Sequence, residues 1–86
     1  MKMPTVLQQD GFRFFYHSNE HEPPHMHVSK AGGELRFILG TESEEPTYKV
    51  LSPMKKNEIR RAFEIVKKQQ KFLLEKWGER YDQQNI

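Results

Sequence analysis

The hydrophobic pattern has a period of two over the first 52 residues of the chain. Alternating apolar and polar side chains are typical of strands that bury one face. The alternating stretches predict three strands and a weaker fourth one: 11–16, 25–30, 34–39 and 47–51. Between the second and third strands, the Gly32-Gly33 pair predicts a hairpin turn that places Ala31 opposite Glu34 and Val28 opposite Phe37.

The pattern changes to a period of three to four residues after Ser52, which is typical of an amphipathic helix. Ser52 is expected to cap this helix, because serine can accept a hydrogen bond from an unpaired N–H group, and Pro53 fits the first helical position. Gln70 interrupts the apolar stripe once. The sequence therefore predicts one long helix over about 53–77, followed by a short tail.

These elements predict an α+β fold, in which an antiparallel sheet of three to four strands, within about 5–51, carries one long C-terminal helix on one face. A length of 86 residues supports a single domain, 1–86. Because one helix covers one face, we expect the other face to be open and to carry the function. The alternation assigns to that face Arg13, Phe15, His25, His27, Ser29, Arg36 and Ile38.

Composition removes several classes of protein. The chain has no cysteine, which excludes disulfides, thiolate zinc sites and a cysteine nucleophile. No apolar run approaches the length of about 20 residues that a membrane span needs, and the start lacks a signal-peptide core. We therefore expect a cytoplasmic protein with no membrane segment.

Charge divides the chain into two halves. Residues 1–52 carry 5 basic and 7 acidic side chains, whereas residues 53–86 carry 9 basic and 5 acidic ones. The simplest explanation is a solvated helix face. An acidic partner or nucleic acid is the second explanation for the basic half.

All four histidines lie within an eleven-residue window: His17, His21, His25 and His27. His25 and His27 share a strand face, where they could bind a metal ion together with Glu22. The same pair could instead act as general acid and base on a phosphodiester, with an arginine stabilising the developing charge. Ordinary polar strand residues are the plain alternative. Arg13 and Arg36 on the same face disfavour a cation, so we expect no metal and no other cofactor.

Five residues are candidates for binding: Arg13, Phe15, Glu22, Lys30 and Arg36. The arginines or Lys30 could hold a phosphate group. Phe15 could stack on a base or anchor a protein partner.

The segments Gly11-Phe12-Arg13-Phe14-Phe15-Tyr16 and Glu22-Pro23-Pro24-His25-x-His27-Val28 resemble the DUF 4160 family of small proteins from bacteria and archaea. The resemblance extends over roughly 3–81 and is most specific in the second segment. It picks out Arg13, Glu22, His25 and His27. Because genes of this family often lie beside another small gene, in the manner of toxin–antitoxin pairs, the resemblance implies a stress or regulatory module.

The leading hypothesis is a protein-interaction or regulatory module of a toxin–antitoxin-like pair; it does not require catalytic activity, and whether the protein is an enzyme stays open. Its expected partner is a small protein from a neighbouring gene, while nucleic acid and a second copy of the chain are further candidates. The first alternative is a small, toxin-like endoribonuclease with His25 and His27 as catalytic residues. The second is a metal-binding domain that uses the same histidines.

Overall fold

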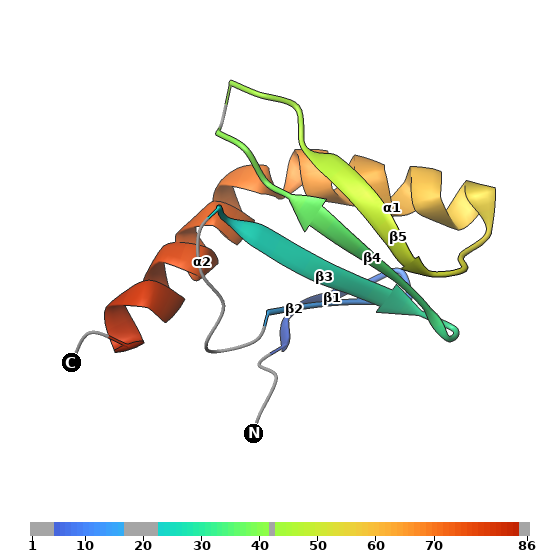
Figure 1. Cartoon of the computed structure of the whole chain (residues 1–86), viewed down its shortest axis with the longest axis horizontal. Coiled ribbons are helices and arrows are strands. Elements are labelled where there is room, and N and C mark those ends of the chain that lie inside the picture. Colours follow the sequence, from blue (N-terminus) through green and yellow to red (C-terminus); the bar gives the residue numbers. More distant parts are fainter. Residues whose placement is uncertain (1–4, 17–22, 42, 85–86) are drawn as a thin grey trace.

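The computed structural model describes residues 5–16, 23–41 and 43–84. Within them the α+β class and the antiparallel sheet are confirmed (Figure 1). The elements follow in the order β1 (Thr5–Gln9), β2 (Phe12–Phe15), β3 (His25–Lys30), β4 (Gly33–Ile38), β5 (Thr47–Ser52), α1 (Lys56–Lys68) and α2 (Gln70–Gln84). Neighbours in sequence are neighbours in the sheet, and β1 and β5 form its two edges. The sequence predicted three to four strands and one long helix, and this was wrong: the described residues form five strands and two helices.

The additional strand is β1, which pairs with β2 through a turn at Asp10 and Gly11. Both turn residues have positive φ, 53° and 82°, as a two-residue hairpin turn of the primed type requires. A bulge between Thr5 and Leu7 breaks the register of this strand. The strand was missed because its two apolar residues are adjacent rather than alternating.

The hairpin between β3 and β4 turns one residue earlier than predicted, at Ala31 and Gly32, where φ is 49° and 85°. Val28 consequently lies opposite Leu35 and not Phe37. The error is two residues in register, so each side chain stays on its predicted face.

Close packing explains why Gly33 does not take the turn position. A Cβ atom on Gly33 would lie 2.6 Å from the main-chain oxygen of Pro53 and 3.0 Å from Met54 Cβ. Only glycine fits there, so Gly33 begins β4 and Ala31 adopts the left-handed conformation, which costs about 1–2 kcal/mol.

The helical part begins later than predicted and is bent. Ser52 ends β5 rather than capping a helix, and α1 begins at Lys56 with no side-chain cap at Lys55. The bend is at Gln69, whose φ and ψ are −102° and 12°. Its N–H group still donates to the Ile65 oxygen, at 2.9 Å, so helical hydrogen bonding continues into α2.

α1 packs on one face of the sheet, and α2 starts there and continues past the end of the sheet (Figure 1). The buried core between the two layers consists of Phe12, Phe14, Tyr16, Met26, Val28, Leu35, Phe37, Leu39, Ala62, Ile65, Val66, Leu73 and Trp77. The members of this core that come from the sheet side, from Phe12 to Leu39, are the apolar residues that alternation assigns to the face under the helix. None of the helices in the described part of the chain is long and apolar enough to cross a membrane.

Candidate functional site

The sheet face turned away from the helix layer holds most of the predicted site residues, and we call it the outer face. Cross-strand pairs join Arg13 to Ser29, His27 to Arg36, and Arg36 to Lys49. Paired residues in an antiparallel sheet point to the same side. The outer face thus carries Arg13, Phe15, His25, His27, Ser29, Arg36, Ile38 and Lys49.

The outer face is not open where the histidines lie. Phe15, His25 and His27 are buried, with 3%, 8% and 6% of their surface exposed. The Trp77 ring, from α2, lies 4.7 Å from the His25 ring between centroids. Because the bend at Gln69 directs α2 past the end of the sheet, this helix reaches the end where β3 begins (Figure 1). The expectation of an open face was therefore wrong at this end.

The rings of His25 and His27 are both held through Nδ1. His25 Nδ1 lies 2.9 Å from the Pro23 carbonyl oxygen, and His27 Nδ1 lies 3.1 Å from Glu34 Oε2. A carbonyl or carboxylate oxygen only accepts, so Nδ1 donates in both rings and Nε2 is the basic nitrogen of the neutral form. His27 also stacks on Phe15, with centroids 5.3 Å apart.

This tautomer suits acid–base chemistry and metal binding equally, since both use an Nε2 oriented by a second contact at Nδ1. Among the described residues, no group of three or more carboxylate or histidine side chains could hold a metal ion. His17, His21 and Glu22 lie outside the described residues, so a role for Glu22 stays a prediction.

The predicted binding residues are not all brought together. Arg13 lies on the outer face, where its Nε donates to Thr5 Oγ1 at 2.6 Å and its guanidinium covers the Phe15 ring. Lys30 instead lies 4.6 Å from the Phe12 ring and donates to the Asp10 carbonyl oxygen at 3.1 Å. The side chain of Lys30 therefore packs against the β1–β2 turn and does not lie beside the arginines of the outer face.

Arg36 is the exception among the polar groups of this face. Its Nε atom is buried and has no hydrogen-bond partner in the described structure. The residue directly opposite on β5 is Lys49, another cation, while Glu34 is engaged by His27. A buried unpaired donor costs about 1–3 kcal/mol, so this position would gain from an additional acceptor.

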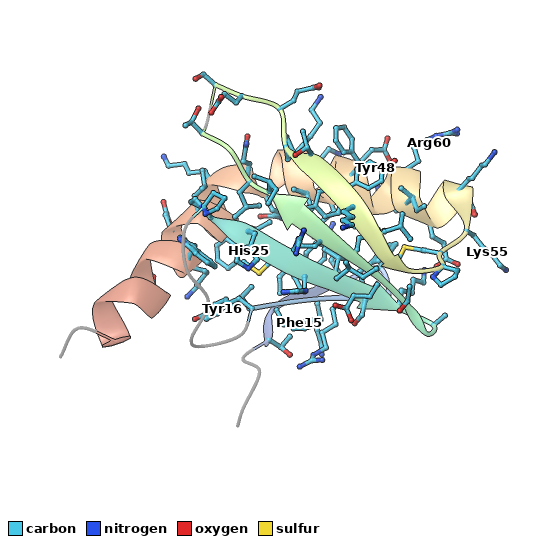
Figure 2. All side chains as sticks on the ribbon, viewed as in Figure 1. Phe15, Tyr16, His25, Tyr48, Lys55 and Arg60 are labelled. Carbon is cyan, nitrogen blue, oxygen red and sulfur yellow. The ribbon has the colours of Figure 1, made fainter. Side chains whose placement is uncertain are left out.

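A second surface, missed by the sequence analysis, lies along β5. Its Tyr48, Val50 and Leu51 side chains are 46%, 44% and 42% exposed. Beside them is a groove of about 520 Å³ between β5 and α1, which we call the β5 groove. Its lining residues are Tyr48, Lys56, Ile59, Arg60 and Phe63. Figure 2 shows Tyr48 and Arg60 on this side of the molecule, away from His25 and Phe15.

The sequence contained a weak signal for this surface. Thr47–Ser52 is the last strand, and in a sheet of consecutive hairpins the last strand is an edge. Its large apolar residues are therefore buried on fewer sides than those of central strands. Strand order cannot be read from hydrophobic alternation alone, so the exposed edge was not predicted.

Comparison with known proteins agrees with the motif. The profile of a family described as a domain of unknown function, DUF4160, matches residues 11–78. The chain belongs to the DUF4160 family. No curated protein and no solved structure matches it.

The DUF4160 region contains both surfaces. It begins just before β2 and ends in α2, so it includes Arg13, the two buried histidines and the β5 groove. β1 lies outside the match. Family membership alone therefore does not decide between the outer face and β5.

Proposed function

We propose that this DUF4160 domain is a protein-interaction module of a regulatory or toxin–antitoxin-like pair, and that it binds its partner along β5. One observation carries the proposal. Among the described residues, the large exposed hydrophobic side chains are Tyr48, Val50 and Leu51, and all three lie on one edge strand. Clustered apolar side chains on a free strand edge are typical of a surface that another chain covers.

The size of the domain suits a partner of similar size. A specific complex needs about 800 Å² of buried surface on each side. One edge strand together with the adjacent groove can supply much of that area. The family resemblance supports a small partner protein encoded by a neighbouring gene.

An endoribonuclease is the second candidate, favoured by the His27–Glu34 contact. A carboxylate on Nδ1 orients an imidazole so that Nε2 can take a proton. The burial of His27 weighs against it, because a general base must come within about 3 Å of the proton that it abstracts. Catalysis would require His27 to become accessible to the substrate, whereas partner binding along β5 would not.

The test uses photo-crosslinking in the cells that produce the protein. A photoreactive amino acid replaces Leu51 on β5 in one variant and Glu75, an exposed residue of α2, in the control variant. After irradiation the protein is recovered with an antibody, with and without nuclease, and crosslinked chains are identified by mass spectrometry.

We expect one small protein, in stoichiometric amount, to crosslink from position 51 but not from position 75, whether or not nuclease is added. A protein that crosslinks only from position 75 would contradict binding along β5. The proposal of an interaction module is overturned if neither position captures a protein.

A further inference from the structure

We infer that the partner contributes an extended acidic segment, which pairs with β5 as a sixth strand of the sheet. This inference rests on the proposed function, because it names the chemistry of the partner at the same surface. Three features of β5 carry it: its free main-chain edge, the groove beside it, and the cations on both of its sides.

The first feature is the unpaired edge. β5 pairs with β4 on one side, and no described strand pairs with it on the other. Edge strands present unpaired N–H and C=O groups that bind an added strand through main-chain hydrogen bonds. β1, the other edge, carries a bulge between Thr5 and Leu7 and none of the large exposed hydrophobic side chains. β5 is therefore the better template.

The second feature is the β5 groove on the helix side. Tyr48 contacts Phe63, with ring centroids 6.4 Å apart, and Ile59 completes an apolar floor. Lys56 and Arg60 also line the groove. Alternate side chains of an added strand point to this side. We expect apolar residues over the floor and carboxylates beside the two cations.

The third feature is the cation pair on the outer face. Lys49 lies directly opposite Arg36, whose Nε is buried without a partner. Like charges directly opposite each other destabilise a sheet. A carboxylate of an added strand next to Lys49 neutralises one charge of this pair and so relieves the repulsion. Both sides of the added strand thus favour acidic residues.

The charge around β5 is unbalanced. Lys49, Lys55, Lys56 and Arg60 form no ion pair with any carboxylate in the described part of the chain. A lysine on an edge strand normally discourages pairing with arbitrary strands. An acidic strand removes that penalty, so the same lysine contributes specificity. A second copy of this chain would instead bring two sets of these cations together.

The experiment selects binders from a displayed library of random peptides, about ten residues long, on the full-length protein. Enriched peptides are synthesised, and their dissociation constants are measured by fluorescence anisotropy. The test variant is Lys56→Glu with Arg60→Glu. The control variant, Lys68→Glu with Lys71→Glu, makes the same change in net charge at exposed helical positions that do not line the β5 groove. Hydrogen exchange of the bound protein reports which main-chain amides become protected.

We expect enriched peptides with net negative charge and apolar residues at alternate positions. Their binding should weaken about tenfold in the Lys56/Arg60 variant and by no more than about twofold in the control. Binding should also protect β5 amides from exchange. Both results together would establish strand addition by an acidic segment.

Four outcomes overturn the inference. The first is enrichment of neutral or basic peptides that still need Val50 and Leu51, which would leave the proposed function intact. The second is acidic peptides that bind both variants equally or leave β5 amides unprotected. The third is a dimer in solution that Leu51→Lys dissociates, because a second copy would then occupy the edge. The fourth is no enrichment, after which crosslinking with the native partner decides the proposed function by itself.

Discussion

The side-chain amide of Gln70 donates to the main-chain carbonyl oxygen of Leu39 at 2.5 Å, across the boundary between α2 and the sheet. The same nitrogen lies 2.8 Å from the carbonyl oxygens of Thr41 and Glu44. Two amide hydrogens thus serve three acceptors, so at least one hydrogen is shared. The single polar residue in the apolar stripe therefore holds the connection that leads from β4 into β5.

Gln70→Leu should destabilise the protein by about 2–4 kcal/mol, because carbonyl groups of the β4–β5 connection lose their donor while an apolar side chain takes its place. Urea denaturation measures the loss. Lys71→Leu, at the exposed neighbouring position, is the control and should change stability by less than about 0.5 kcal/mol. Equal stability of the two variants would show that Gln70 does not hold the connection.

Gly33→Ala should cost more than Gly32→Ala, although only Gly32 has a positive φ, of 85°. At Gly33 an added Cβ would lie 2.6 Å from the Pro53 oxygen, so the backbone must shift, at a cost of about 2–3 kcal/mol. At Gly32 no atom lies within 4 Å of the added Cβ, and only conformational strain of about 1 kcal/mol remains. Thermal denaturation of both variants gives the order, and the reverse order would contradict the packing argument.

The faces of the strands could be predicted from the sequence better than their partners. A shift of two residues in the β3–β4 register left Met26 and Val28 on the core face, because alternation has a period of two. The register itself depends on the space around Gly33, which Pro53 and Met54 define from far along the chain. Periodicity contains no information about such a contact.

The candidate site was harder to predict for the same reason. Alternation placed His25 and His27 on the outer face, but it gave no sign that Trp77, which follows the bend at Gln69, would pack against His25. One interruption of an apolar stripe does not reveal a bend in a helix. The exposed β5 surface depends on strand order, which is also a property of the whole fold.

The contribution of the Arg61–Asp10 pair to the free energy of unfolding should be the same at every pH between about 7 and 10, because Arg61 stays charged over this range. Arg61 Nε donates to Asp10 Oδ2 at 2.8 Å, and this hydrogen bond, together with the carboxylate charge, raises the pKa of Arg61 above its ordinary value. A group whose pKa is higher in the folded than in the unfolded protein stabilises the fold fully at a pH below its pKa in the unfolded chain. This stabilisation is lost only as the pH rises through its pKa in the folded protein. For an arginine that window lies in strongly alkaline solution.

The control for this prediction is Arg61→Lys, because a lysine loses its charge near its ordinary pKa of about 10.4. Urea midpoints of the two proteins should differ by a constant amount at neutral pH and diverge as pH approaches about 11. Added salt should reduce the effect of the exposed pair in both proteins. A divergence that begins near neutral pH would point to another titrating group.

His27→Gln should destabilise the protein by about 1–2 kcal/mol, because it removes the stack on Phe15 and the Nδ1–H donor to Glu34. Crosslinking of the partner from position 51 should be unchanged, since His27 is not among the residues that line the β5 groove. Glu34→Gln is the matched variant: its amide oxygen still accepts from Nδ1 but carries no charge to support a catalytic imidazole. A different result would be that the wild-type protein cleaves RNA and that both variants lose this activity while circular dichroism shows that they remain folded. That result would indicate a ribonuclease that uses the buried histidines. Unchanged partner capture without cleavage would leave His27 and Glu34 as parts of the packed sheet that supports β5.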